Sequence, residues 1–236
     1  MIELRRGSVR APESLDELIS TREQFLTAYQ NAAYARRYRH LVDKVRHVET
    51  ALGSSRLSTS VATYLFKLMA YKDEYEVARL YTEPAFMEKI KAQFEGDYVL
   101  KFHLAPPLLA RRDAAGHLIK REFGPWMMRA FGVLARLRFL RGTSLDVFGH
   151  TAERRTERAL VVEYEQTLLM MLAKLDVGNL EVAIQVASLP EQIRGFGHVK
   201  ESSMASVAAK RLALLEAFKA PVRELAAVNA AGKVAA

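Results

Sequence analysis

One stretch of this sequence, residues 97–126, lacks the helical spacing of apolar residues found in most of the chain. It reads DYVLKFHLAPPLLARRDAAGHLIKREFGPW. Its first part, Tyr98–Leu104, is rich in the β-branched and aromatic residues that favour strands. Pro106 and Pro107 have no backbone N–H group to donate, so regular structure is expected to stop there.

The second half of the stretch has the pattern of a hairpin. Asp113–Gly116 is a turn-forming group between Leu108–Arg112 and His117–Phe123. A lone hairpin is barely stable in water, so neighbouring helices must cover it. The expected fold class is therefore mainly α: a helical domain with a small β-hairpin or sheet insertion around residues 98–123.

On both sides of this stretch, apolar residues recur at helical spacing. Ser14 and Glu17 have the spacing of a capping box, and Thr151 is a good N-cap. A short turn or helix is expected at 189–194. The longer predicted helices are 14–50, 58–81, 84–95, 125–140, 151–174, 176–188 and 201–219.

The chain shows no internal repeat of fixed period and no linker that would divide it. We expect residues 1–13 to be a flexible basic leader and residues 14–220 to be a single, mostly helical domain. The alanine-rich residues 221–236 are expected to fray, since Pro221 interrupts the last helix.

Composition and charge narrow the function classes. The formal net charge of +8 favours a negatively charged partner, such as nucleic acid, an acidic protein or a phosphorylated small molecule. No apolar run reaches the roughly 20 residues of a membrane span, and the start of the chain does not resemble a signal peptide. We therefore expect a cytoplasmic protein with no membrane partner. The absence of cysteine excludes disulfides, a cysteine nucleophile and cysteine-ligated iron–sulfur clusters within this chain.

Basic residues gather between positions 111 and 141. Arginine side chains can bind phosphate or carboxylate through two parallel hydrogen bonds. The same residues also fit a solvated basic face whose arginine stems cover apolar surface. The cluster comprises Arg111, Arg112, Lys120, Arg121, Arg129, Arg136, Arg138 and Arg141.

A second group of interest lies in Glu191–Lys200, which reads EQIRGFGHVK. Its glycines let the backbone approach another group closely, next to cationic and aromatic side chains. The segment fits either an anion-binding loop or a helix end that turns into the next helix. Its candidate anion-binding residues are Arg194, Gly195, Gly197, His198 and Lys200.

Other charged or titratable residues have structural interpretations. His40 and His47 share a helix face and are expected to be a solvated pair, so no metal site is assigned. His103 is expected to be packed and hydrogen-bonded on its strand. Within Tyr71–Tyr81, charges at helical spacing, including Lys72, predict internal salt bridges that hold the helix in place. No catalytic residue is assigned.

Four segments together resemble a known family: LFKLMAYKDEYEVARLYTEPAF, FEGDYVLKFHLAPPLLARRD, KREFGPWM and LPEQIRGFGHVK. They are similar to the C-terminal region, of unknown function, of the long fused form of indolepyruvate ferredoxin oxidoreductase. The resemblance runs from about Ser14 to Lys210. It implies an enzyme that converts arylpyruvates to aryl-acyl-CoA with thiamine diphosphate, magnesium, coenzyme A and iron–sulfur clusters, and that passes electrons to ferredoxin.

This chain departs from the whole enzyme. It lacks the Gly-Asp-Gly motif of the thiamine diphosphate and magnesium site, because Gly96-Asp97 is followed by Tyr98, and it has no cysteine. We therefore expect no cofactor in this chain, with the catalytic domains in a longer polypeptide or a separate subunit. The expected role is an accessory, non-catalytic domain that packs on them and contacts coenzyme A or ferredoxin. The alternative is a stand-alone basic helical module for an acidic protein or for nucleic acid, although no nucleic-acid reader motif is present.

Overall fold

The computed structural model describes residues 14–96, 98–104, 111–112, 118–119, 121–195 and 198–220, with only the backbone described at Arg111, Arg112, Leu118 and His198. The expected leader 1–13, the tail 221–236, the two prolines at 106 and 107 and the turn at 113–116 lie outside these residues.

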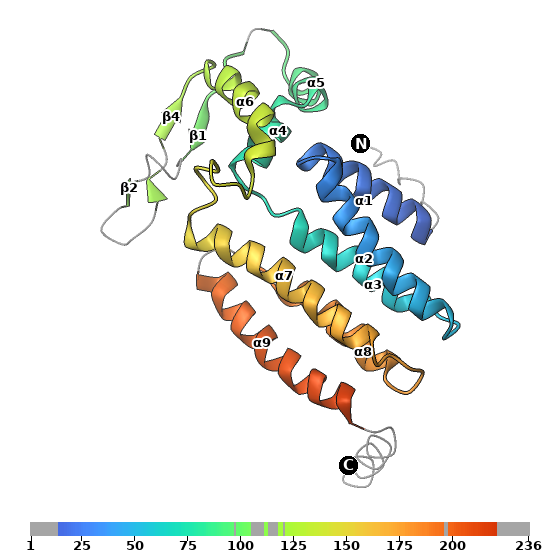
Figure 1. Cartoon of the computed structure of the whole chain (residues 1–236). Coiled ribbons are helices and arrows are strands. Elements are labelled where there is room, and N and C mark those ends of the chain that lie inside the picture. Colours follow the sequence, from blue (N-terminus) through green and yellow to red (C-terminus); the bar gives the residue numbers. More distant parts are fainter. Residues whose placement is uncertain are drawn as a thin grey trace, which may run out of the picture. The chain divides into compact units, whose positions relative to one another are not determined.

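The chain is mainly helical with a small antiparallel β insertion, which confirms the predicted fold class (Figure 1). In the described part of the chain, no helix is both long enough and apolar enough to cross a membrane. The helices are α1 Leu15–Tyr29, α2 Ala32–Thr50, α3 Arg56–Met69, α4 Glu74–Thr82, α5 Pro84–Gln93, α6 Met127–Arg136, α7 Ala152–Leu172, α8 Leu180–Ser188 and α9 His198–Lys219, with 3-10 helices η2 Leu137–Leu140 and η3 Leu189–Gln192.

The β insertion consists of two short strand pairs. Strand β2 (Arg111–Arg112) pairs with β3 (Leu118–Ile119) around the predicted turn. Farther out, β1 (Phe102–Leu104) pairs with β4 (Arg121–Phe123), so that Phe102 lies opposite Phe123. The predicted strand at 98–104 therefore shortens to β1, and it pairs with the far end of the hairpin.

Two predicted helices are wrong in their extent. The helix expected over 14–50 is interrupted between Tyr29 and Ala32, and the helix expected over 58–81 is interrupted between Met69 and Glu74. At the first break, the carbonyl of Tyr29 accepts a hydrogen bond from Arg141 at 2.5 Å. At the second, Asp73 is the N-cap of α4 and accepts the Glu76 N–H at 2.8 Å. Uninterrupted helical periodicity concealed both breaks.

Other local signals are confirmed. The capping box closes in both directions, with Glu17 N–H donating to Ser14 Oγ at 3.2 Å and Ser14 N–H donating to Glu17 Oε2 at 2.9 Å. Thr151 Oγ1 accepts the Arg154 N–H at 3.3 Å at the start of α7.

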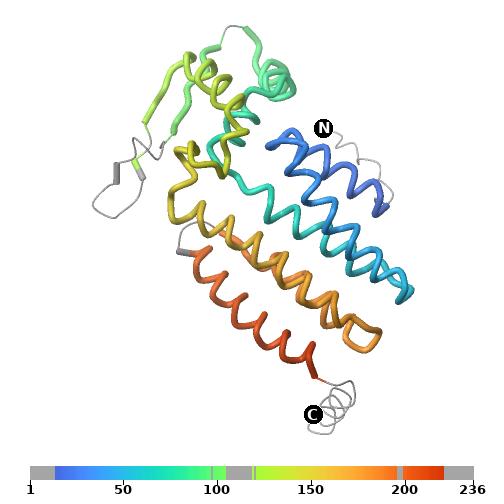
Figure 2. The backbone as a smooth tube through the Cα atoms, in the orientation of Figure 1, coloured from blue at the N-terminus to red at the C-terminus, as the bar shows by residue number. Residues whose placement is uncertain are grey.

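Close contacts divide the chain into two compact units. Of the described residues, the first unit comprises those within 14–27, 32–70 and 159–220, and the second comprises those within 28–31 and 71–158. In the first unit, α3 packs against α2 and α8, and α8 packs against α9. The tube in Figure 2 shows α9 running beside α7. The largest side chains fully buried in this unit are Ile19, Leu26, Tyr38, Leu57, Leu65, Met69, Leu168 and Met171.

In the second unit, α4 packs on α6 and the sheet contributes Phe102 to their core. The ring of Tyr81 stacks on Phe131 with centroids 5.1 Å apart and meets Phe102 edge-on at 5.6 Å. Because Phe102 faces this core, the next residue of the strand faces outward. The side chain of His103 is 63% exposed, so the prediction of a packed histidine is wrong.

A buried glutamate at the end of α2 caps the start of α3. Glu49 is fully buried, and its carboxylate accepts the N–H groups of Leu57 and Ser58, each at 2.7 Å, and the Ser58 hydroxyl at 2.5 Å. The first turn of a helix has N–H groups without helical partners, and a negative charge there is favourable. Glu49 therefore joins the two helices through polar contacts.

We predict that Glu49→Ala lowers the free energy of unfolding by about 2–4 kcal/mol, because it leaves buried donors without acceptors. Urea titration followed by circular dichroism measures this change. The matched control is Glu181→Ala, in the first turn of α8, whose carboxylate pairs with Arg56 at the surface. That control should cost less than about 1 kcal/mol, and equal losses in the two variants would contradict the capping role.

Candidate functional site

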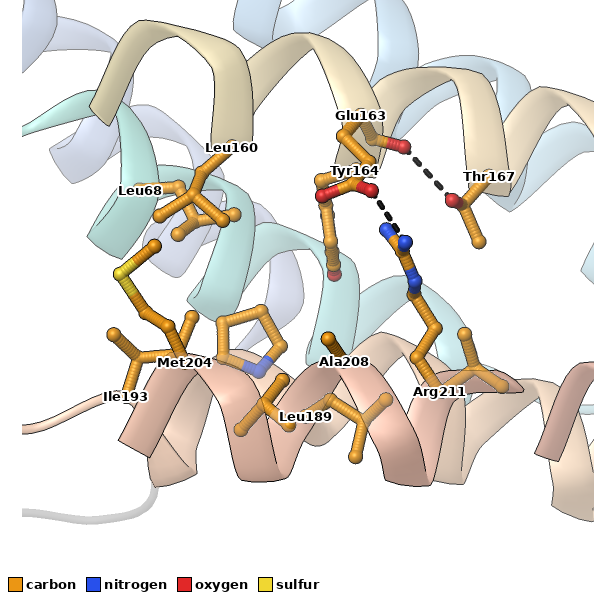
Figure 3. Close-up of a pocket in the computed structure, with 13 residues that line it drawn as sticks. Leu68, Leu160, Glu163, Tyr164, Thr167, Leu189, Ile193, Met204, Ala208 and Arg211 are labelled. Carbon is orange, nitrogen blue, oxygen red and sulfur yellow. Dashed lines mark hydrogen bonds and ion pairs between the residues drawn. The ribbon is translucent and has the colours of Figure 1, made fainter. Parts of the chain in front are cut away.

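The first unit contains a largely apolar cavity of about 150 Å³ (Figure 3). Residues of α3, α7, α8, η3 and α9 surround it, together with Ile193, which follows η3. Its apolar lining residues are Leu68, Leu160, Val186, Leu189, Pro190, Ile193, Met204, Val207 and Ala208, and its polar lining residues are Glu163, Tyr164, Thr167 and Arg211.

The two long helices present matching stripes to the cavity. Side chains spaced by three, four and seven residues share one face of a helix. In α7 these are Leu160, Glu163, Tyr164 and Thr167, and in α9 they are Met204, Val207, Ala208 and Arg211. The stripes face each other, with Arg211 reaching Glu163 across them and the apolar residues forming the rest of the wall.

Polar groups are concentrated at one end of the cavity. Figure 3 shows Arg211 extending from α9 to Glu163 on α7, while Leu160, Met204 and Ile193 lie at the other end. Arg211 Nη2 forms an ion pair with the Glu163 carboxylate. Arg211 Nε is buried and has no hydrogen-bond partner among the described residues.

The tyrosine beside this end is neutral. Its hydroxyl donates to the carbonyl of Ala187 at 2.8 Å. Burial raises the pKa of Tyr164 well above its usual value. Tyr164 therefore adds a fixed hydrogen bond to the wall and no charge.

A lysine on α3 donates hydrogen bonds to the segment 190–193, which contributes to the cavity wall. Lys67 Nζ donates to the carbonyls of Pro190, Glu191 and Ile193 at 2.7, 3.2 and 3.2 Å. The Tyr64 hydroxyl donates to Glu191 Oε2 at 3.0 Å. Partial burial and the nearby Arg194 guanidinium lower the pKa of Lys67. These contacts hold the carbonyls at the end of η3, of which that of Pro190 also accepts the Ile193 N–H at 3.2 Å.

The structure describes only part of the predicted anion loop at 191–200. Arg194 is exposed, its Nε donates to the Glu191 carbonyl at 3.1 Å, and its Nη2 lies 3.6 Å from the Glu191 carboxylate. Gly195 has φ +89°, and a Cβ there would lie 2.6 Å from Val199 Cγ1. Lys200 lies in the first turn of α9. Gly197 is outside the described residues and His198 has only its backbone described, so anion binding here stays a prediction.

The structure describes five side chains of the predicted basic cluster. Arg121, Arg129 and Arg136 are exposed, whereas Arg138 is half-buried and donates to the carbonyl of Ala135 at 3.2 Å. Arg141 is only 4% exposed, so its inclusion in a basic surface is wrong. The side chains of Arg111 and Arg112 are not described, and Lys120 is outside the described residues.

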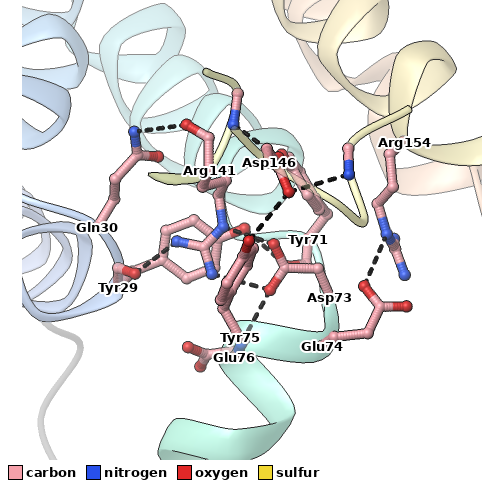
Figure 4. Close-up of polar contacts among 12 residues, drawn as sticks. Tyr29, Gln30, Tyr71, Asp73, Glu74, Tyr75, Glu76, Arg141, Asp146 and Arg154 are labelled. Carbon is pink, nitrogen blue, oxygen red and sulfur yellow. Dashed lines mark hydrogen bonds and ion pairs between the residues drawn. The ribbon is translucent and has the colours of Figure 1, made fainter. Parts of the chain in front are cut away.

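Arg141 instead forms a buried ion pair with Asp73 in the second unit (Figure 4). Its Nε lies 2.5 Å from Asp73 Oδ2, and its Nη2 lies 2.8 Å from Asp73 Oδ1. Its Nη1 donates to the Tyr29 carbonyl at 2.5 Å, and its guanidinium carbon lies 3.6 Å from the centre of the Tyr29 ring. Sequence reasoning missed this pair, although Asp73 directly precedes a helical pattern and has the chemistry of an N-cap.

A second buried carboxylate extends this network. Asp146 Oδ1 accepts the Tyr75 hydroxyl at 3.2 Å and the Gly149 N–H at 2.9 Å, and its Oδ2 accepts the Gly142 N–H at 2.7 Å. Burial and the Asp146 charge raise the pKa of Tyr75. All four carboxylate oxygens of Asp73 and Asp146 therefore accept hydrogen bonds from within the unit, which identifies the network as structural.

The acidic helix α4 also pairs its charges internally. Arg79 Nη2 lies 2.7 Å from the buried carboxylate of Glu76, which confirms the predicted salt bridge between these two residues. Arg79 also pairs with Glu83. Lys72 lies before α4 begins, so the helical pair expected for it is wrong. Among the described residues, no group of three or more histidine, aspartate or glutamate side chains is placed to hold a metal ion.

The fold and its internally paired charges define a mainly helical protein whose described cavity is largely apolar. The model of a family of unknown function, DUF6537, matches residues 15–213. The chain belongs to this family. No curated protein and no solved structure matches it.

We predict that Lys67→Met lowers the free energy of unfolding by about 1–3 kcal/mol, because three carbonyls lose a charged donor. The matched control is Lys210→Met on α9, whose ammonium donates to the exposed Gln192 side chain. Urea unfolding should show a change within about 0.5 kcal/mol for this control. A Lys67 variant as stable as the control would show that the three contacts do not hold the segment.

We also predict that Asp73→Ala lowers the free energy of unfolding by about 3–5 kcal/mol, because it leaves the buried Arg141 charge unpaired. Adding Arg141→Met removes that charge, so the double variant should lose less than the sum of the single variants. Asp43→Ala, which breaks the half-exposed pair with Arg39, serves as the control and should cost less than about 1 kcal/mol. Additive losses at Asp73 and Arg141 in a double-mutant cycle would contradict the coupling.

Proposed function

We propose that this chain is an accessory, non-catalytic domain of a cytoplasmic enzyme like indolepyruvate ferredoxin oxidoreductase. It packs on the catalytic domains or subunits that convert arylpyruvates to aryl-acyl-CoA and reduce ferredoxin. Thiamine diphosphate, magnesium and the iron–sulfur clusters belong to those parts of the enzyme.

One observation carries this proposal. Three charged residues of the motifs that resemble that enzyme are engaged within the fold: Lys67 with the η3 carbonyls, Asp73 with Arg141, and Glu76 with Arg79. Residues used in this way stabilise a scaffold. The family match at 15–213 also spans nearly the same residues as the resemblance.

The outer face of α6 offers a surface for such packing. Trp126, Arg129, Val133 and Arg136 recur at helical spacing from the start of the helix and are exposed, with Trp126 and Val133 each 59% accessible. Exposed apolar residues next to arginines are typical of protein interfaces, where tryptophan and arginine contribute much of the binding energy. We call Trp126, Arg129, Val133 and Arg136 the α6 face.

The charge of the α6 face favours an acidic surface on the catalytic part as its partner. Arg129 and Arg136 are separated by about 10 Å along the helix axis, since each residue adds about 1.5 Å. This separation suits carboxylates spread over a protein surface better than a single pyrophosphate, which needs convergent donors. Coenzyme A stays the alternative ligand, with Arg111, Arg112 and Arg121 as the predicted contacts.

We predict that Val133→Asp, and separately Arg129→Glu with Arg136→Glu, weaken binding of the full chain to the catalytic part at least tenfold. A charge in an apolar interface and the reversal of two interface arginines both oppose docking. Calorimetry or size-exclusion chromatography measures the association. Val177→Asp, at a 74% exposed position in the first unit, is the matched control and should bind normally.

The accessory role would be refuted if the unmodified chain did not associate with the catalytic part and its removal left turnover unchanged. Retention of the chain on nucleic acid at moderate salt would instead favour the stand-alone basic module.

A further inference from the structure

We infer that the groove between α2 and α7 is a docking site for an acidic amphipathic helix of a partner protein. The groove lies within the first unit, and it shares no residue with the α6 face. The inference does not rest on the proposed accessory role, so either proposal can fail without the other.

The groove is formed by two helices that run in the same direction. Arg37 on α2 pairs with Glu165 on α7, with Arg37 Nη2 lying 2.6 Å from the carboxylate. Farther along both helices, Val48 of α2 and Leu172 of α7 line the same open groove, which has a volume of about 500 Å³. A furrow between two such helices accommodates a third helix laid along it.

The α7 side of the groove is an apolar strip. Val162, Gln166, Leu169 and Ala173 share one face of the helix because they are spaced by four, three and four residues. All are exposed, with Val162 at 42% and Leu169 at 45% accessibility, and Leu169 and Ala173 line the groove itself. The apolar face of a docked helix repeats at the same spacing, so it would cover this strip.

The α2 side of the groove is basic. Four exposed basic residues recur along it at helical spacing. They are Arg36, His40, Lys44 and His47. Among the described residues, neither Arg36 nor Lys44 has an ion-pair partner. Asp43 also lines the groove, but Arg39 Nε holds its carboxylate at 2.8 Å. The charge left uncompensated on this side is therefore positive.

Charge complementarity and length define the partner. Aspartate or glutamate along one flank of a docked helix would meet Lys44 and Arg36, while its apolar face covers Leu169. The basic residues from Arg36 to His47 extend over roughly 16 Å at about 1.5 Å per residue, which suits a helix of about three turns.

Two other occupants fit the groove less well. A two-fold contact between copies of this chain would place the same basic face against itself, so like charges would oppose it. Nucleic acid gains its affinity from many neutralised phosphates. Here the free cations of Arg36 and Lys44 stand beside an apolar strip, which a phosphate backbone cannot cover.

The test is a methyl NMR titration of the full chain with synthetic peptides of about 14 residues, which span roughly 21 Å as helices. The first peptide carries leucines on one helical face and glutamates along one flank. The second has lysine in place of glutamate, and the third has the composition of the first in scrambled order. We expect saturable shifts at Val48, Val162, Leu169 and Leu172 with the first peptide, and binding at least about tenfold weaker for the other two. Added salt should weaken binding of the first peptide.

Variants separate the apolar and the basic side of the groove. Leu169→Asp and Lys44→Glu should each weaken binding of the first peptide at least about fivefold. The matched controls lie on α9: Leu212→Asp, at a 63% exposed position, and Lys210→Glu, also exposed, should bind within about twofold of the unmodified chain. Circular dichroism verifies that each variant is folded.

Four outcomes would overturn the inference. The first is the absence of saturable shifts at these methyl groups, and the second is equally tight binding of the lysine or scrambled peptide. The third is unchanged binding in Leu169→Asp and Lys44→Glu. The fourth is the same set of shifts without peptide as the chain concentration rises, which would identify a second copy as the occupant, or with a short DNA duplex, which would identify a polyanion.

Discussion

The buried ion pair between Asp73 and Arg141 is the contact on which the second unit depends. Removing two charges from water costs several kcal/mol per ion, and the cost is offset only when both groups are fully hydrogen-bonded. The geometry meets this condition, since the guanidinium binds both Asp73 oxygens and the Tyr29 carbonyl. Each of these partners is also a helix end: Tyr29 is the last residue of α1, and Asp73 caps α4. The need to satisfy one buried guanidinium therefore accounts for two helix boundaries that lie far apart in the sequence.

The first unit satisfies its helix ends by the same means. Glu49 supplies negative charge to the N–H groups at the start of α3, and Lys67 supplies positive charge to the carbonyls that end η3. These signs match the partial charges of the two kinds of helix terminus. In each case the side chain comes from a different helix, so the capping contact also fixes how two elements pack. The fold therefore restricts which residue types can stand at such positions. Motifs rich in lysine, aspartate and glutamate can for this reason be distinctive in sequence and still lack a catalytic arrangement.

The difference between local signals and contacts from distant residues explains which features the sequence could predict. The fold class, the capping box at Ser14 and the hairpin around 113–116 rest on local signals, and each is confirmed where the structure describes it. The breaks after Tyr29 and Met69 depend on a guanidinium contributed from position 141, so local periodicity could not reveal them. The prediction of a packed His103 was wrong because the exposure of His103 depends on which face of β1 meets the core. Phe102 occupies that face. The cavity was missed because its stripes on α7 and α9 have ordinary core spacing. The one available signal was a charge of opposite sign in each of two apolar stripes, Glu163 and Arg211.

The paired charges change how the net charge of +8 should be interpreted. Arg37, Arg141 and Arg211 each have a carboxylate partner within the fold, so their charge is largely neutralised at short range. The net charge still acts at long range, where it would speed encounter with the proposed acidic partner and is screened by salt. Specificity requires exposed residues in a fixed arrangement, which the proposed α6 face would supply through two arginines beside apolar side chains. In the proposed complex, long-range attraction and short-range recognition are thus carried by different residues. A uniform loss of positive charge elsewhere on the surface would slow association, whereas a change within the α6 face would shorten the life of the complex.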